Sequence, residues 1–275
     1  MIIDAHVHFW DPAARRHAWL DEEPALQRRF GPDDYDAGRH DVAGMVFVQA
    51  DCRDEEALDE VRWVLELAAR DSRVLGIVAY APLQLGAGAA GALAAVAAQP
   101  GVVGIRRLLQ DEPQVLAGDA LLADGVRLLA DHALPFDLCV RDHQLEAVDA
   151  LVAACPEVVF VLDHLGKPAA HARRLDPWRA DLARLAAHER VVCKLSGLAT
   201  EAGPDWRAAE LRPYVEHALE VFGPERCMVG SDWPVCTLAT RPAAWFDLVL
   251  DVAAGLSPHE RDAVLHGTAR SVYGL

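Results

Sequence analysis

The sequence predicts a single-domain α/β protein, a (β/α)8 TIM barrel spanning residues 1–275. Eight short apolar runs each precede a loop or helical segment, and this alternation indicates parallel strands joined by crossovers. The length of 275 residues suits a barrel of this kind, which commonly takes about 250 residues. A doubly wound open sheet is the alternative, but it usually has a glycine-rich first turn, and His8-Phe9-Trp10-Asp11 has no glycine.

The first strand is predicted over residues 1–10, where polar and apolar residues alternate. Ile3, Ala5 and Val7 would lie on one face, with Asp4, His6 and His8 on the other. Because neutral imidazole is a good ligand for divalent metals, His6 and His8 could bind one ion from this strand. Two histidines at this spacing could equally be ordinary polar residues at a sheet edge.

The remaining elements follow in order along the chain. Further strands are predicted at 44–49, 74–80, 102–106, 135–140, 158–164, 191–196 and 227–232. Helices are predicted from an N-cap at Asp54 and at 119–132, 142–155, 177–188, 206–222, 242–254 and 258–273. Residues 11–40 form a long polar loop with some helix, typical of a lid or a binding loop, and a Gly/Ala-rich segment follows the third strand.

Composition excludes several classes of protein. A formal net charge of −16 argues against nucleic-acid binding, which needs a basic face. No window approaches about 18 uninterrupted apolar residues, so no membrane span or membrane partner is expected. The six cysteines form no CxxC pair, and the first residues do not resemble a signal peptide. We therefore expect reduced, mostly buried thiols and a cytoplasmic protein.

Polar residues gather at the predicted strand ends, where the active sites of such barrels lie. Seven of the eight strands end in ionisable or amide groups, which is costly without partners and indicates a site. The candidates are His6, His8, Gln49, Arg106, Asp137, Arg141, His164, Lys194 and Asp232.

Several of these residues have a structural alternative. His164 could be a satisfied core histidine, and Lys194 could form an ion pair with Asp137 or Asp232. Asp163 is expected to turn outward, because His164 would take the inward place on the strand. Trp10 and Trp233 could offer flat faces to a sugar, or could pack at the rim of the barrel.

Four motifs together resemble the amidohydrolase superfamily. They are Asp4-Ala5-His6-Val7-His8, Asp163-His164-Leu165-Gly166-Lys167-Pro168, Gly230-Ser231-Asp232-Trp233-Pro234 and the closing segment from His266 to Leu275. The residues around these motifs, together with Cys193-Lys194-Leu195-Ser196-Gly197-Leu198, resemble the sequences of the sugar-lactonase branch. This branch includes L-fuconolactonase-like and L-rhamnonolactonase-like enzymes. The resemblance covers the whole chain and implies a hydrolase that takes a small-molecule sugar lactone.

The chain departs from the two-metal members of that superfamily. Those members carry a lysine at the end of strand four and a histidine at the end of strand five, whereas strand four here ends in Arg106 and the predicted strand five has no histidine. The resemblance therefore implies at most one divalent ion, Zn²⁺ or Mn²⁺, held by some of His6, His8, His164 and Asp232. Some members of the branch are thought to work without a metal, so the ion could also be dispensable.

The resemblance also implies roles for individual residues. Asp232 would be the general base that activates water, and His164, with the other histidines, would polarise the lactone carbonyl. Arg106 would bind the carbonyl oxygen or the carboxylate product, while Lys194 would neutralise Asp232 or contact a hydroxyl. The expected substrate-binding residues are Trp10, Gln49, Asp137, Arg141 and Trp233. The alternatives are a metal-dependent decarboxylase of an aromatic acid and a non-catalytic sugar-binding barrel.

Overall fold

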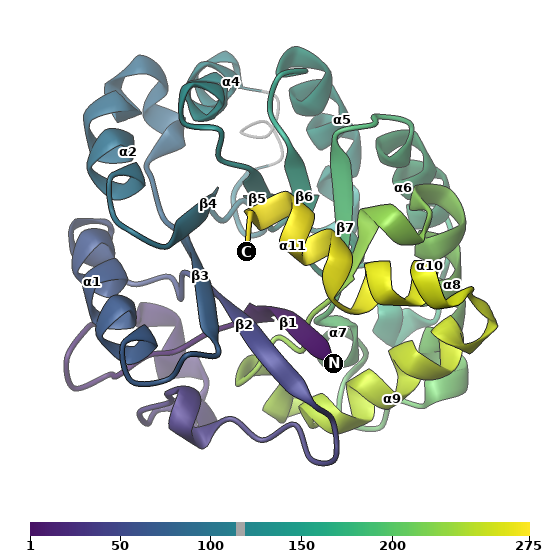
Figure 1. Ribbon diagram of the computed structural model, residues 1–275. Coiled ribbons are helices and arrows are strands. Elements are labelled where there is room, and N and C mark those ends of the chain that lie inside the picture. The colour runs from purple at the N-terminus through teal and green to yellow at the C-terminus, as the bar shows by residue number, and fades with distance from the viewer. Residues whose placement is uncertain (114–118) are drawn as a thin grey trace.

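Eight parallel strands form one sheet in the order of the chain, as the computed structural model shows for residues 1–113 and 119–275 (Figure 1). The strands are β1 Ile2–Val7, β2 Val42–Val48, β3 Val74–Ala79, β4 Val102–Arg106, β5 Phe136–Leu138, β6 Phe160–Leu162, β7 Val191–Leu195 and β8 Cys227–Val229. The predicted (β/α)8 barrel is therefore confirmed.

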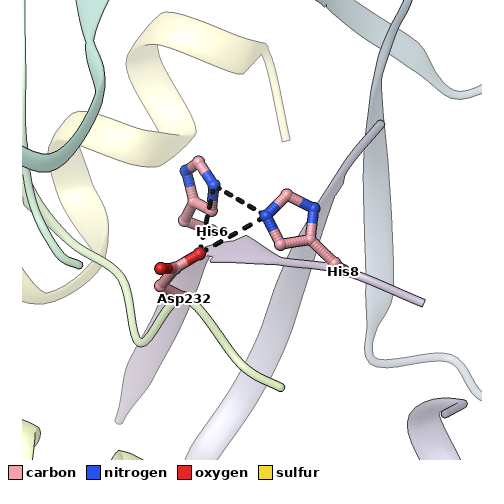
Figure 2. A group of neighbouring side chains, drawn as sticks. All are labelled: His6, His8 and Asp232. Carbon is pink, nitrogen blue, oxygen red and sulfur yellow. Dashed lines mark hydrogen bonds and ion pairs between the residues drawn. The ribbon is translucent and has the colours of Figure 1, made fainter. Parts of the chain in front are cut away.

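The sheet closes where the ends of β1 and β8 meet. Val7 forms a parallel bridge with Trp233, and the amide of His8 donates to the Trp233 carbonyl at 2.7 Å. The Asp232 amide donates to the carbonyl of His6 at 2.9 Å. This closure brings the polar end of the first strand beside the polar end of the last (Figure 2).

Helices cover the outside of the barrel (Figure 1). They are α1 Ala57–Ala68, α2 Ala90–Ala97, α4 Ala120–Arg127, α5 Leu145–Ala154, α6 Trp178–Ala186, α7 Leu198–Ala202, α8 Ala208–Phe222, α9 Pro242–Val252, α10 Pro258–Asp262 and α11 Thr268–Tyr273. The predicted long loop holds three short 3-10 helices, Ala18–Glu22, Pro24–Leu26 and Pro32–Asp34. Within the described part of the chain, none of the helices has the length and apolar character needed to cross a membrane.

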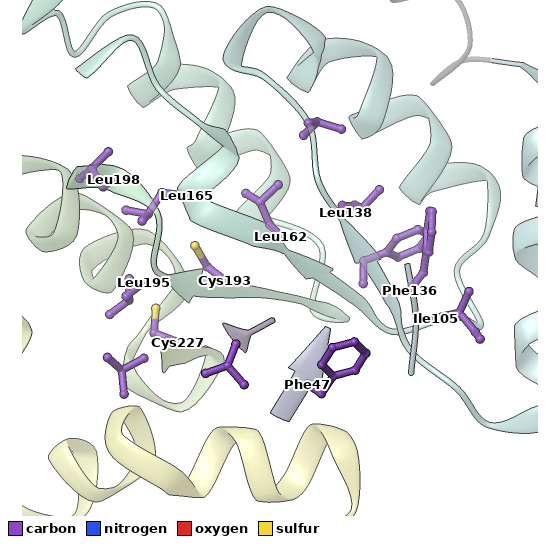
Figure 3. Close-up of a cluster of buried hydrophobic side chains, with 14 of the residues drawn as sticks. Phe47, Ile105, Phe136, Leu138, Leu162, Leu165, Cys193, Leu195, Leu198 and Cys227 are labelled. Atoms are coloured by element: carbon purple, nitrogen blue, oxygen red, sulfur yellow. The ribbon is translucent and has the colours of Figure 1, made fainter. Parts of the chain in front are cut away.

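Two apolar clusters hold the barrel together. The larger one fills the space between the strands and the surrounding helices, and Figure 3 shows part of it, with labelled residues from Phe47 to Cys227. The smaller one joins side chains of six strands to Ala269 and Tyr273 of α11, an arrangement that only the barrel interior allows. Helix α11 therefore closes one end of the barrel, across the middle of the view in Figure 1.

The predicted alternation along β1 is wrong at its middle. Ile3 and Ala5 belong to the interior cluster, whereas Val7 belongs to the outer one, and the pairing with β2 shifts register between Asp4 and Val7. An irregularity of this kind re-aims the residues that follow it. His6 and His8 consequently face the site, while Asp4 accepts a hydrogen bond from the Tyr35 hydroxyl instead.

The ends of several elements also differ from the prediction. Strand β6 ends at Leu162, two residues early, and Asp163–Gly166 form a 3-10 turn in which His164 and Leu165 have φ of +55°. Asp54 is no N-cap of α1, because a short 3-10 turn precedes that helix and the Asp54 carboxylate accepts from the Tyr80 hydroxyl at 2.6 Å. The turn after β6 sets the directions of the side chains of Asp163 and His164.

Candidate metal and catalytic centre

Two histidines and one aspartate converge at the closure of the barrel (Figure 2). The Nε2 atoms of His6 and His8 lie 3.2 Å apart, and Asp232 Oδ1 lies 3.7 and 3.4 Å from them. His164 Nε2 lies 3.9 Å from the same oxygen. All four side chains are buried, and each comes from the end of strand one, six or eight, as the sequence predicts.

The far ring nitrogens are occupied by other groups. His8 Nδ1 lies 2.7 Å from the Val48 carbonyl, and His164 Nδ1 lies 2.8 Å from Ser196 Oγ. His6 Nδ1 lies 3.2 Å from the Asp163 carboxylate. At His8 the carbonyl fixes the tautomer that carries a proton on Nδ1, which leaves the lone pair on Nε2. At His6 the Lys194 ammonium lies as close to Nδ1, at 3.2 Å, as the Asp163 carboxylate does. The Nε2 atoms of the two rings face one another across 3.2 Å.

This arrangement fits a divalent metal. Ligand atoms roughly 2.0–2.2 Å from a tetrahedral zinc are roughly 3.3–3.6 Å apart, close to the 3.2, 3.7 and 3.4 Å found here. Burial lowers the pKa of His6 and His8, and lowers that of His164 to about 4 despite the nearby Asp232 carboxylate. The rings are therefore neutral at neutral pH, the form that binds a metal.

The backbone holds Asp232 in an unusual conformation. Its φ is +63°, a value that non-glycine residues rarely adopt. The buried Asp4 carboxylate accepts the amide proton of the preceding residue, Ser231, at 2.8 Å and so ties this turn to β1. Burial alone would raise the pKa of the Asp232 carboxyl, but the three histidine rings hold it well below its usual range. Strain of this kind is typical of functional sites.

A network of buried charges lies behind the histidines. Lys194 Nζ contacts Asp137 at 2.5 Å and Asp163 at 3.1 Å, and Arg106 Nη1 lies 3.3 Å from Asp163. The Tyr273 hydroxyl donates to Asp137 from α11. Burial raises the pKa of Asp137 to about 6, whereas Lys194, His6 and Arg106 hold the pKa of Asp163 well below its usual range against the effect of burial.

The prediction that Asp163 turns outward is wrong. Its carboxylate is fully buried between His6, Arg106 and Lys194. The strand stops at Leu162, so the alternation of faces that the prediction assumed ends there, and Asp163 and His164 can both point toward the site. Gly197 makes room for the His164 ring, since a Cβ at this glycine would lie 2.4 Å from His164 Nδ1.

A pocket of about 180 Å³ opens onto this cluster. Its lining residues are His8, Trp19, Ala50, Asp51, Arg106, Leu108, Gln110, Asp111, Cys139, His164, Lys167, Asp232 and Val235. Arg106 is 4% exposed, and its Nε atom has no hydrogen-bond partner among the described residues. The pocket therefore places a buried cation beside the histidines and Asp232.

The structure brings together only some of the predicted site residues. His8, His164, Arg106 and Asp232 line the pocket, and His6 lies directly against them. Lys194 and Asp137 are absent from the lining and form a buried ion pair with each other, as in the structural alternative for Lys194, and the substrate-binding role of Asp137 stays a prediction.

The other expected substrate-binding residues also lie outside the lining. Trp10 is buried and donates its indole N–H to the Leu26 carbonyl, and Trp233 packs against other aromatic rings, so the rim-packing alternative describes both. Arg141 pairs with Asp111 at 2.9 Å. The Gln49 side chain is buried, and its Oε1 accepts from the Asp51 amide.

Sequence reasoning missed several residues of the pocket. Lys167 lies three residues after His164 in the quoted motif, and its ammonium pairs with Glu201 at 3.3 Å. Asp51 lies three residues after the end of β2, so its position near a strand end was a usable signal. Trp19 comes from the long loop, whose course over the barrel no local pattern gives.

Comparisons with known proteins agree with this geometry. The model of a family described as amidohydrolase matches residues 3–275. Two L-fucono-1,5-lactonases, from Burkholderia multivorans and Burkholderia ambifaria, are 39% and 35% identical over 99% of this chain and 96% and 95% of their own. The crystal structure of an amidohydrolase from Burkholderia multivorans with bound zinc is 37% identical, with a TM-score of 0.88 over 100% of this chain and 99% of that chain.

Proposed function

Because this chain belongs to the amidohydrolase family, we propose that it is a lactonase that opens a sugar lactone to the aldonic acid with water. The observation that carries the proposal is the convergence of His6, His8 and Asp232 at the floor of a pocket that Arg106 also lines. Relatives that are 35% and 39% identical over nearly their whole length are L-fucono-1,5-lactonases, which makes an aldonolactone the best-supported substrate.

Asp232 supplies the base. The three rings approach its Oδ1 atom, which leaves Oδ2 to take a proton from water as the water oxygen attacks the lactone carbonyl. The bond between the carbonyl carbon and the ring oxygen then breaks, and the ring oxygen takes the proton held by Asp232 to become a hydroxyl, which restores the Asp232 carboxylate. The new carboxylic acid ionises at neutral pH, so each turnover releases one proton.

The carbonyl oxygen gains negative charge during the attack, and the pocket provides the opposite charge. Arg106 lines the pocket as a buried cation, and its terminal nitrogens contact Asp163 and the Gln49 carbonyl. Lys167 is a second cation in the lining. His6, His8 and Asp232, with His164 beside them, would hold a divalent ion, for which we propose zinc, and the bound ion would supply a Lewis acid for the carbonyl.

Lys194, Asp163 and Asp137 act as positioning residues in this proposal. Asp163 contacts Nδ1 of His6 and the guanidinium of Arg106, so it orients a candidate metal ligand and the pocket cation together. Lys194 balances the charge of both buried aspartates. The free state of all six cysteines supports a reducing compartment, and we retain the cytoplasm and a single domain as predictions.

Metal content is the first test of this centre. Protein purified without chelator is expected to carry no more than about one divalent ion per chain, because the candidate ligand atoms lie close together. The His8→Ala variant should lose most of this bound metal. Elemental analysis of both proteins measures this. Two tightly bound ions in the parent protein would contradict a single centre. Full lactonase activity without a bound ion would mean that the histidines act only through hydrogen bonds.

Arg106→Lys is expected to lose most of the activity while keeping the fold. Lysine cannot reproduce the planar set of donors with which the guanidinium contacts both Asp163 and the Gln49 carbonyl. The measurement is kcat/KM for a lactone beside the thermal unfolding curve of the same sample. Unchanged turnover in a folded Arg106→Lys protein would place this residue outside the chemistry.

A pair of assays tests the function itself. Purified protein is offered aldonolactones of both enantiomeric series with a pH indicator, and hydroxybenzoates with detection of carbon dioxide. We expect proton release from at least one lactone well above the spontaneous rate and no carbon dioxide. Carbon dioxide without lactone turnover would favour the decarboxylase alternative, and stabilisation by a sugar with neither reaction would favour the binding barrel.

A further inference from the structure

We propose that Asp51 selects uncharged, hydroxylated lactones by accepting hydrogen bonds from substrate hydroxyls and repelling substrates that carry a carboxylate. The inference rests on the lactonase function proposed above and adds a residue that determines specificity. It starts from three observations: the way the chain holds Asp51, the lack of a partner for its carboxylate, and its place in the pocket.

Three hydrogen bonds hold the segment that follows β2. The Asp51 amide donates to Gln49 Oε1 at 2.6 Å, and the Ala50 amide donates to Glu60 Oε1 at 3.1 Å. The Trp19 indole donates to the Ala50 carbonyl at 2.9 Å. Asp51 itself has φ of +59°, a strained conformation for a residue with a side chain. Such a conformation persists only when the surroundings impose it.

The Asp51 carboxylate differs from its acidic neighbours because no group in the described part of the chain pairs with it directly, and the cations of Arg106 and Arg107 act on it only from a distance. Asp111, which also lines the pocket, pairs with Arg141, and the neighbouring Asp54 accepts from the Tyr80 hydroxyl. Among residues 1–113 and 119–275, no hydrogen bond or ion pair engages the Asp51 carboxylate. A fixed carboxylate with free lone pairs at a pocket wall is an acceptor for hydroxyl groups.

Asp51 lies where two hollows of the surface adjoin. It lines the catalytic pocket together with His8, His164 and Asp232, and it also lines an adjoining hollow of about 340 Å³ that none of those three residues lines. A lactone that reacts at Asp232 and extends toward the adjoining hollow would bring ring hydroxyls to Asp51.

Charge then decides which lactones are accepted. An ionised carboxylate accepts hydrogen bonds from hydroxyls strongly, and such bonds to charged groups change affinity by roughly ten-fold to a hundred-fold. A carboxylate on the substrate would meet a like charge at Asp51 and would lose those bonds as well. The wall at Asp51 thus favours neutral aldonolactones over lactones of sugar diacids.

Two variants distinguish the effect of the Asp51 carboxylate from the effect of the backbone conformation at this residue. Asp51→Asn keeps the size of the side chain and removes its charge, while Asp51→Gly removes the side chain and tolerates the positive φ. Asp59→Asn is the matched control, since Asp59 lies on the exposed face of α1 and pairs with Arg62. For each protein, kcat and KM are measured with a neutral aldonolactone and with a lactone of the same ring that carries a carboxylate.

The parent protein and Asp59→Asn should prefer the neutral lactone. Asp51→Asn and Asp51→Gly should raise KM for the neutral lactone by roughly ten-fold or more, with little change in kcat. The ratio of kcat/KM for the neutral lactone to that for the lactone with a carboxylate should fall by a similar factor. An unchanged ratio between the two substrates, or an equal loss on both, would overturn the inference.

A binding measurement keeps this test independent of turnover. Calorimetric titration of the neutral lactone into Asp232→Asn protein, with and without Asp51→Gly, should show weaker binding in the double variant. Binding that depends on Asp51 without turnover by the parent protein would reject the lactonase proposal and keep the role of Asp51. If the parent protein turns over the lactone but Asp51→Gly does not change its binding, the role of Asp51 is rejected and the lactonase proposal is kept.

Discussion

Asp232→Asn is expected to lower kcat for lactone hydrolysis by roughly 10²–10⁴-fold, the usual contribution of a general base. Asparagine keeps the size and shape of the side chain but cannot take a proton from water. The Asp232 carboxylate contacts three histidine rings at the closure of β1 and β8, and its unusual backbone is held by hydrogen bonds that asparagine does not disturb. The fold and its thermal stability should change little.

The hydroxide-driven rate of lactone opening, measured in the same buffer, is the control for this variant. Metal content should be measured on the same samples, because Asp232 is also a candidate ligand. If Asp232→Asn keeps more than about a tenth of the parent kcat above background, the loss falls short of that of a base and Asp232 is not one. His164 would then be the next candidate.

Lys194→Met should have the largest effect on stability. Removing one member of a buried ion pair leaves an uncompensated charge and typically costs about 3–5 kcal/mol, which lowers Tm by roughly 6–20 °C in a protein of this size. Lys194 is fully buried between the carboxylates of Asp137 and Asp163, and methionine offers them no donor. Thermal and urea unfolding of both proteins measure the difference.

An exposed ion pair provides the matched control. Arg62→Met removes a cation that pairs with Asp59 on the surface of α1, where such a pair is worth about 0–1 kcal/mol. Lys194→Met should therefore unfold well before Arg62→Met. Equal stability of the two variants would show that Asp137 and Asp163 are satisfied without the lysine. It would also remove the positioning role given to this network.

The barrel and its catalytic end could be predicted because both follow from local patterns. Apolar runs separated by crossovers gave the eight strands, and the bounds of β4 at 102–106 match the prediction. The motifs at His6, His8, His164 and Asp232 lie at strand ends that the fold must bring together, which is why four distant positions meet in one cluster.

The errors arose where the backbone leaves regular geometry. The register shift in β1 and the turn after Leu162 break the alternation of faces, which moved Asp4 away from the cluster and Asp163 into it. Trp10 and Trp233 were chosen because they adjoin the motifs, but both rings are buried among other aromatic side chains. Trp19 and Asp51 reach the pocket from loops, whose paths depend on tertiary contacts such as the Trp19–Ala50 hydrogen bond.

The most direct test is the initial rate of proton release from L-fucono-1,5-lactone, followed with a pH indicator for the parent protein and for Asp232→Asn at equal concentration. Our account predicts rapid release by the parent protein and a rate for the variant that is roughly 10²–10⁴-fold lower once the spontaneous rate is subtracted. Equal rates for the two proteins, or no release above background from this or any other aldonolactone by the metal-loaded parent protein, would contradict it.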